Sequence, residues 1–171
     1  MKHIYSFAAT LVAVVFAGLS LSSTQAQDAT ASFIPGRLEN AQGESISRES
    51  LKGKVVALYF SAHRCVRCRA FTPTLVEFYE KHKGDDFEIV FVSFDNTPEM
   101  KKQYIEEAGM KFLSVAGNKA RVHFDLANQY KVSMLPRLIV FNPDGKRVSE
   151  DSMADINSEP ELALLKWKTS R

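Results

Sequence analysis

Cysteine is the scarcest reactive residue in this sequence. Only two cysteines, Cys65 and Cys68, occur among its 171 residues. Two thiols cannot build a multi-disulfide scaffold or a four-thiolate zinc site. The chain also lacks a large excess of charge of one sign: it has 22 basic and 20 acidic residues, which give a formal net charge of +2. The chain therefore has no overall field that would capture nucleic acid or an acidic membrane.

Other functional motifs are also missing. The sequence contains no glycine-rich phosphate loop, no basic stripe with interleaved aromatic residues, and no internal repeat. We therefore expect neither phosphate transfer nor nucleic acid as a partner. What is present, 45% hydrophobic and 25% charged residues, is ordinary for one globular domain with its own core.

The first 26 residues have the layout of a cleavable secretory signal. Lys2 and His3 precede an apolar run at residues 11–19, and small and polar residues follow up to Ala26. We expect cleavage there, export to the periplasm or the medium, and no membrane attachment of the mature chain. Residues 27–171 would then form a single domain, which we expect to be monomeric. The alternative is an uncleaved anchor, since residues 4–21 approach the length of a membrane span.

Apolar runs and helical spacing predict an α/β domain. Runs rich in strand-forming residues predict buried strands at residues 55–61, 87–94 and 138–141. Apolar spacing and capping residues predict helices at residues 66–83, 98–108, 121–130 and 160–168. Turn-forming residues predict an N-terminal hairpin at residues 37–46 and a returning strand at residues 146–149. The first two strands and the helix between them have the length that a parallel crossover requires.

The two cysteines form a C-x-x-C motif where the strand at residues 55–61 gives way to a helix. A helix start exposes unpaired N–H groups and the positive end of the helix dipole, which stabilise the thiolate of Cys65. Cys68 lies one turn further in and is expected to be more shielded. We therefore predict that Cys65 attacks and Cys68 resolves, in a dithiol–disulfide couple that needs no other cofactor.

Three arginines, Arg64, Arg67 and Arg69, flank the two cysteines. Permanent positive charge close to a sulfur favours its thiolate form. We predict that these arginines stabilise the Cys65 thiolate. The alternative interpretation is that they form an ordinary solvated face.

These residues resemble the thioredoxin-fold superfamily, and within it the tryparedoxin and nucleoredoxin branch. The resemblance spans residues 33–149 and rests on residues 55–62 before the motif, on Arg69, Phe71 and Pro73 after it, and on residues 91–95. Met134, Leu135 and Pro136 are similar to the cis-proline loop of the family. The resemblance implies a thioredoxin fold: a central mixed β-sheet flanked by helices, here with the N-terminal β-hairpin as an extension.

The resemblance also implies a function. It implies a thiol–disulfide oxidoreductase that forms mixed disulfides with protein or small-thiol partners and depends on an electron donor or acceptor. Leu135, Pro136 and Arg137 would shape the substrate groove, where the backbone near Leu135 pairs with the extended chain of the partner. The sequence departs from the family pattern at Arg64, where tryptophan is usual. Tyr59 stands where thioredoxin itself carries a buried acid, although tyrosine is usual there in the tryparedoxin-like branch.

Two other functions stay open from the sequence. A soft-metal carrier could bind Cu(I) through the two cysteines with His63 or His123, although the neighbouring arginines disfavour a cation. We therefore expect no metal. A redox-inert interaction domain could hold a permanent disulfide between Cys65 and Cys68, but so short a loop restricts the unfolded chain very little.

Overall fold

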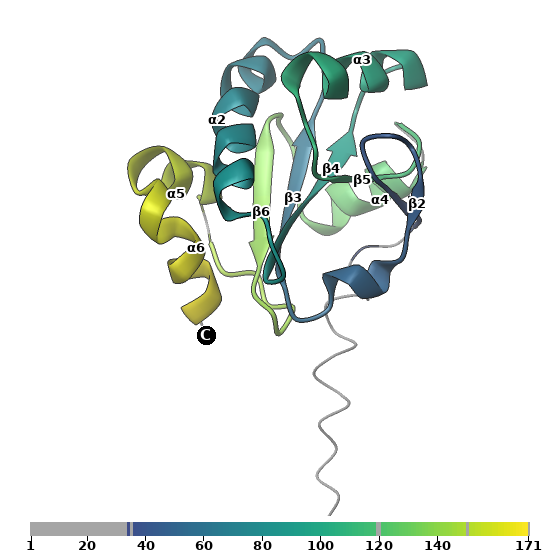
Figure 1. The fold of residues 1–171 in the computed structure, drawn as a ribbon. Helices are drawn as coiled ribbons and strands as arrows, with labels where there is room; N and C mark the ends of the chain where they lie inside the picture. The colour runs from purple at the N-terminus through teal and green to yellow at the C-terminus, as the bar shows by residue number, and fades with distance from the viewer. Residues whose placement is uncertain (1–33, 35, 119–120, 150, 171) are drawn as a thin grey trace, which may run out of the picture.

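A mixed sheet of six strands forms the middle of the molecule (Figure 1). The computed structural model describes residue 34 and residues 36–118, 121–149 and 151–170; the expected secretory signal lies outside these residues. The strand order is β2-β1-β5-β4-β3-β6. The bounds are β1 Leu38–Glu39, β2 Ser45–Ile46, β3 Val55–Ser61, β4 Phe87–Ser93, β5 Leu113–Val115 and β6 Arg137–Phe141.

Helices cover both faces of the sheet. The described helices are η1 Arg48–Leu51, α2 Val66–His82, α3 Pro98–Ala108, α4 Arg121–Gln129, α5 Ser152–Ser158 and α6 Pro160–Thr169. Figure 1 shows α2, α5 and α6 together on one side of β3 and β6, and α4 on the other. None of these described helices is both long enough and apolar enough to cross a membrane.

Strand β3 lies at the centre of the core. All of its residues are buried, and it pairs in parallel with β4 and antiparallel with β6. Successive side chains of a strand point to opposite faces of the sheet. Ala57 and Tyr59 accordingly pack into the cluster that α2, α3, α5 and α6 complete, whereas Leu58 and Phe60 pack toward η1 and α4. The expected thioredoxin-type layering is confirmed.

Helix α3 begins and ends where its capping residues predict. The Thr97 side chain accepts a hydrogen bond from the Met100 N–H at 3.2 Å, and Pro98 occupies the first helical position. Gly109 ends the helix in the left-handed conformation, with a φ of 65°. The predicted N-terminal hairpin is also confirmed, as β1 pairs with β2 around the turn at residues 40–43.

The predicted returning strand at residues 146–149 is wrong. The preceding turn at residues 142–145 is present, but Arg147 then forms an isolated bridge to Phe141 in place of a ladder. The Val148 N–H still donates to the Val140 carbonyl at 3.0 Å, but this pairing is too short to form a strand. Three short elements, η1, β5 and α5, were not predicted, since segments of four, three and seven residues give too little periodicity.

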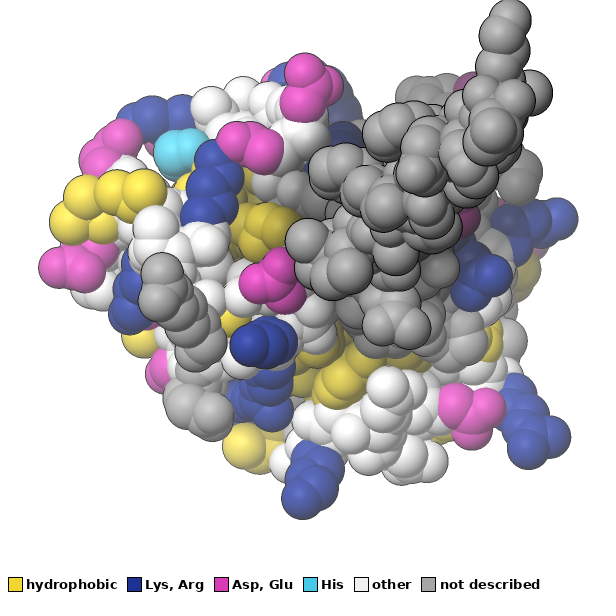
Figure 2. Space-filling view, turned by 90° about the horizontal axis from the view of Figure 1, so that it is seen from below, with side chains coloured by type: hydrophobic (Ala, Val, Ile, Leu, Met, Phe, Trp, Pro, Cys, Tyr) yellow, Lys and Arg dark blue, Asp and Glu magenta, His cyan; other side chains and the backbone are white. Residues whose placement is uncertain are grey.

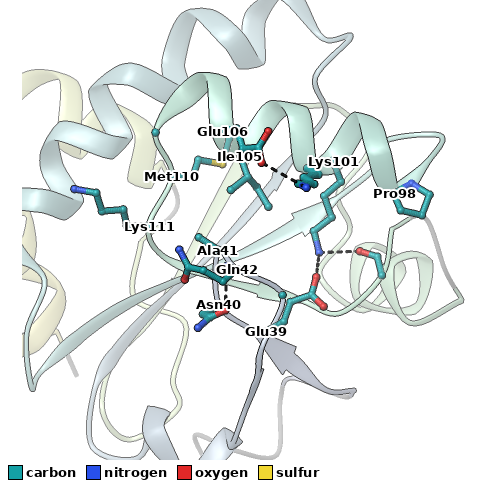
Figure 3. Close-up of a pocket in the computed structure, with 14 residues that line it drawn as sticks. Glu39, Asn40, Ala41, Gln42, Pro98, Lys101, Ile105, Glu106, Met110 and Lys111 are labelled. Atoms are coloured by element: carbon teal, nitrogen blue, oxygen red, sulfur yellow. Dashed lines mark hydrogen bonds and ion pairs between the residues drawn. The ribbon is translucent and has the colours of Figure 1, made fainter.

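A buried lysine fixes the N-terminal hairpin to the rest of the domain. The Lys101 side chain is only 5% exposed, and its Nζ donates to Glu39 Oε1 at 2.5 Å. It also donates to the carbonyl oxygens of Val115 and Gly117, each at 2.9 Å. These bonds join β1, β5 and α3 at one edge of an open pocket of about 700 Å³ (Figure 3). Burial lowers the pKa of Lys101, and the Glu39 carboxylate opposes that shift.

Replacing Lys101 with methionine removes the charge and keeps most of the apolar stem. We expect the free energy of unfolding to fall by about 3 kcal/mol, because the Glu39 carboxylate and two carbonyl groups lose a buried donor. Denaturant unfolding of the oxidised protein measures the loss. Lys102→Met is the matched control: Lys102 faces Glu106 at the surface of the same helix, and its loss should cost less than about 0.5 kcal/mol. Equal losses for the two variants would contradict the assignment.

Candidate functional site

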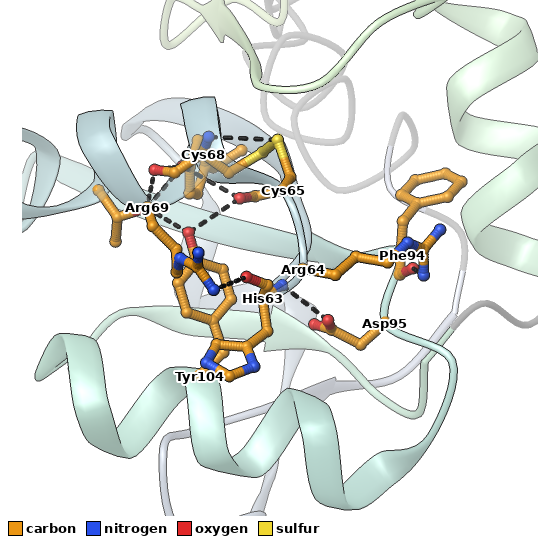
Figure 4. Close-up of a disulfide and its surroundings, with 11 residues drawn as sticks. His63, Arg64, Cys65, Cys68, Arg69, Phe94, Asp95 and Tyr104 are labelled. Atoms are coloured by element: carbon orange, nitrogen blue, oxygen red, sulfur yellow. Dashed lines mark hydrogen bonds between the residues drawn. A yellow bond between two sulfur atoms is a disulfide. The ribbon is translucent and has the colours of Figure 1, made fainter.

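The two cysteines lie at the end of β3, where α2 begins. They form a disulfide, with their Cα atoms 5.1 Å apart. Cys65 is the N-cap of α2, and its Sγ accepts a hydrogen bond from the Cys68 N–H at 3.2 Å (Figure 4). Cys65 is partly exposed, whereas Cys68 is fully buried. The expected difference in shielding is therefore present.

The first turn of α2 suits a negatively charged sulfur. Its N–H groups face the end of the helix at which Cys65 lies, and the first turn contains no acidic residue. Such an end carries a partial positive charge. A thiolate formed at Cys65 on reduction would be stabilised there, and it would be reachable from solvent.

The three arginines take different directions. Arg64 extends away from the sulfurs, and its Nη1 donates to the Phe94 carbonyl at 3.2 Å and to Asn96 Oδ1 at 2.8 Å (Figure 4). Arg69 turns back toward the loop and donates to the His63 carbonyl at 3.2 Å. Arg67 is exposed on the first turn of α2. The structure thus places all three beside the motif, and their predicted effect on the thiolate stays a prediction.

A buried carboxylate holds the loop that precedes Cys65. Asp95 Oδ1 accepts the His63 backbone N–H at 2.7 Å, and Asp95 Oδ2 accepts the Ser93 hydroxyl at 2.9 Å. Asp95 itself is fully buried at the end of β4. The loop between β3 and α2 is therefore tied to the neighbouring strand. In the sequence, Asp95 contributes only to the resemblance, although an acid directly after a buried apolar run is a signal of such a role.

The loop before β6 reaches the same end of the sheet. The Leu135–Pro136 peptide bond is cis, as the resemblance implied. Arg137, the first residue of β6, pairs with Phe60 of β3. Leu135 and Pro136 therefore continue past the end of β3 on the side where the chain turns toward Cys65. Met134, just before them, is 66% exposed.

A closed ring of four buried hydroxyl groups lies under Cys68. Tyr59 and Ser61 come from β3, Thr72 from α2 and Tyr104 from α3. Around the ring, the oxygen distances are 3.1 Å from Ser61 to Tyr59, 2.7 Å from Tyr59 to Thr72, 2.5 Å from Thr72 to Tyr104 and 3.1 Å from Tyr104 to Ser61. The Cys68 carbonyl lies within reach of two members, 2.8 Å from Thr72 Oγ1 and 3.4 Å from the Tyr59 hydroxyl.

The four hydroxyl groups have fewer protons than contacts, because Thr72 and Tyr59 can also donate to the Cys68 carbonyl. Each hydroxyl has one proton, so the four contacts are all satisfied only when every group donates in the same sense around the ring. If Tyr59 or Thr72 turns its proton to the Cys68 carbonyl, one contact of the ring loses its donor. Burial, with Tyr104 close by, raises the pKa of Tyr59, which therefore stays a neutral donor at physiological pH. The resemblance pointed to Tyr59 alone and missed the other three residues.

The described residues bring together no group of three or more His, Cys, Asp or Glu side chains that could hold a metal ion. His63 Nε2 lies 2.9 Å from Glu107 Oε2. His123 is buried on α4. The structure thus gives the two histidines of the metal-carrier hypothesis separate surroundings.

The closed ring predicts energetic coupling between its tyrosines. Tyr59→Phe and Tyr104→Phe should each lower the free energy of unfolding by about 1–2 kcal/mol, because each leaves buried hydroxyls short of a partner. In a double-mutant cycle the two losses should depart from additivity by at least about 0.5 kcal/mol. Tyr79→Phe is the control, since the Tyr79 hydroxyl interacts with Glu88 instead. Its loss of stability should add to that of Tyr59→Phe. Additive losses for Tyr59 and Tyr104 would show that the ring does not act as a unit.

Comparisons with known proteins agree with this geometry. Residues 53–147 match a family model described as thioredoxin-like. Nucleoredoxin from Mus musculus is 36% identical over 136 residues, which cover 78% of this chain and 31% of nucleoredoxin. Tryparedoxin from Trypanosoma brucei brucei is 35% identical over 141 residues, which cover 80% of this chain and 96% of that protein. The chain thus spans less than a third of the mouse nucleoredoxin and nearly all of the tryparedoxin.

Solved structures show the same likeness. Tryparedoxin II from Crithidia fasciculata superposes with a TM-score of 0.72 at 29% identity, covering 80% of this chain and 92% of that one. Tryparedoxin from Trypanosoma brucei gives 0.71 at 31% identity, covering 81% and 97%. The chain therefore belongs to the thioredoxin-like family and is similar, within that family, to the tryparedoxins and nucleoredoxins.

Proposed function

We propose that this protein is a thiol–disulfide oxidoreductase whose reactive centre is the Cys65–Cys68 pair. The observation that carries the proposal is the disulfide itself, which joins a partly exposed sulfur at the start of α2 to a buried one a turn further in. This asymmetry provides one sulfur that partners can reach and one that they cannot. The family relationship supports the same reaction.

The exchange transfers two electrons in two steps. In the reduced protein, the Cys65 thiolate attacks one sulfur of a partner disulfide, forms a mixed disulfide and releases the other partner sulfur as a thiolate. The Cys68 thiolate then attacks Cys65 Sγ, which closes the internal disulfide and releases the second partner sulfur. The protein is oxidised and the partner disulfide is reduced to two thiols. The reverse sequence oxidises a partner dithiol.

We assign the other site residues as follows. The N–H groups of α2 stabilise the Cys65 thiolate, together with the charges of Arg64, Arg67 and Arg69. Leu135, Pro136 and Arg137 line the approach to the disulfide. Asp95 is a positioning residue, because it holds the backbone of the loop before Cys65. No cofactor beyond the disulfide is required.

The partners that we propose are protein thiols or disulfides, with a separate electron donor or acceptor. A small thiol can serve as well: one solved neighbour is a tryparedoxin II complexed with glutathionylspermidine. We also propose that the domain acts as a monomer formed by residues 27–171. The direction of electron flow follows from the reduction potential of the couple and of its partner.

Single serine variants test the two cysteine roles. Cys65→Ser should abolish exchange, because no reachable thiolate remains. Cys68→Ser should still attack partners but should accumulate mixed disulfides, which non-reducing gels and mass spectrometry detect. The wild-type protein, equilibrated in glutathione buffers, should show one two-electron transition between dithiol and disulfide. If the wild type is active but Cys68→Ser traps no partner, the role assignment is wrong; if its thiols never equilibrate, the redox function itself fails.

We propose further that the protein is exported. The support is the order of residues 1–26, with a basic start, an apolar run and a small residue, Ala26, at the end. Expression of the full chain in a secreting host should yield a product that begins at Gln27, located outside the cytosol. N-terminal sequencing or intact mass identifies the start. A product that begins at Met1 and sediments with membranes would show an uncleaved anchor instead.

A further inference from the structure

The segment that carries the disulfide is basic. The segment of residues 62–69 contains three arginines and no acidic residue, and α2 has no acid in its first turn. The nearest acid on the neighbouring strand, Asp95, is fully buried and accepts the His63 N–H and the Ser93 hydroxyl. Glu107 of α3 lies within 2.9 Å of His63. Glu107 also interacts with Arg69, so Arg64 and Arg67 are the cations of this segment that pair with neither of these two acids.

The formal net charge of the whole chain is only +2. Figure 2 views the end of the domain opposite the disulfide, and basic and acidic side chains are interspersed there. Basic side chains pair with acidic ones at that end, as Lys168 does with Asp86 and Lys52 with Glu49. This end thus differs from the segment of residues 62–69, whose charged side chains are all basic.

The arginines stand on two sides of the disulfide. Arg64 reaches toward the end of β4, where it binds Phe94 and Asn96, whereas Arg67 and Arg69 lie on the first turns of α2. A ligand with a single charge would meet one of these sides. An extended segment that crosses the disulfide would meet both, and it could place carboxylates on either flank of its cysteine.

Two exposed apolar side chains complete the surface. Val66, directly after Cys65, is 71% exposed, and Met134, directly before Leu135 and Pro136, is 66% exposed. Other large apolar side chains are exposed too, among them Leu162 and Leu165, but these two flank Cys65 and the cis-proline, where a partner that reaches the disulfide would contact them. They come from α2 and from the loop before β6, so one apolar residue of an extended segment could touch both elements.

We propose that the partner is a protein whose reactive cysteine lies in an extended acidic segment, with an apolar residue beside that cysteine. The proposal rests on the proposed redox function and adds the class of substrate. Carboxylates of the partner pair with Arg64 on one side and with Arg67 or Arg69 on the other, while its apolar residue covers Val66 and Met134. Opposite charges accelerate encounter and exclude partners of the wrong sign.

Matched peptides test this inference. Each carries one cysteine next to a valine, blocked as the disulfide with 2-mercaptoethanol, and differs only in two flanking residues on each side: glutamate, glutamine or lysine. Pre-reduced full-length protein is mixed with each peptide, and release of the peptide thiol gives a second-order rate constant. In each reaction the protein ends as the Cys65–Cys68 disulfide, and the peptide thiol and 2-mercaptoethanol are released.

At low ionic strength, the glutamate peptide should react about tenfold faster than the lysine peptide, with the glutamine peptide between them. The ratio should approach one in 1 M salt, where the screening length falls to about 3 Å. The double variant Arg64→Gln, Arg67→Gln should reduce the ratio to about threefold or less. Lys146→Gln, which removes one charge at the opposite end of β6, should leave it unchanged. Each ratio compares one protein with itself, so effects on the thiolate cancel.

The possible failures are distinguishable. Equal rates for the glutamate and lysine peptides, or a preference that salt does not weaken, would overturn the acidic-partner inference and leave the redox function standing. If the reduced protein reduces neither the peptides nor the neutral 2-hydroxyethyl disulfide, the redox function fails and the inference fails with it. A preference that Lys146→Gln weakens as much as the arginine variant would assign it to the net charge of the protein and overturn the local site.

Discussion

The position of the reactive cysteines follows from the complete burial of β3. Helices cover this strand on both faces, and β4 and β6 pair with both of its edges. On such a strand, a reactive side chain can be reached from solvent only where the strand ends. The chain turns there into α2, so that Cys65 meets solvent at the start of the helix while Cys68 lies against the core. One packing constraint thus separates the two sulfurs into an accessible and a protected member.

Because β3 is buried, its hydroxyl groups beneath the disulfide need hydrogen-bond partners within the protein. Tyr59 and Ser61 place hydroxyl groups in the core, and Thr72 of α2 and Tyr104 of α3 form hydrogen bonds with them. The ring links the central strand to two helices by directional bonds, in a region otherwise held by apolar packing. On the other side of the loop, Asp95 fixes the backbone of His63 by accepting its N–H. The reactive turn is therefore held from both β3 and β4.

Local signals made much of the fold predictable from the sequence. Strand β3 is a continuous apolar run, and α3 carries its own cap, proline and terminal glycine, so neither needs information from distant residues. The C-x-x-C motif was found for the same reason. The hydroxyl ring was not, because its members come from three elements and each is unremarkable alone. Lys101 looks like any surface lysine in the sequence, and only the fold reveals its burial beside Glu39.

The segment after β6 determines which part of that edge strand stays open. Val148 donates to the Val140 carbonyl at 3.0 Å and Arg147 bridges to Phe141, so the returning chain occupies the far end of β6. Exposed strand edges are the usual templates for unwanted sheet-to-sheet association. Here the covered portion is the C-terminal end of β6, whereas Pro136 precedes its N-terminal end. The short segment after the turn at residues 142–145 thus shields the part of this edge where an unwanted strand could otherwise add.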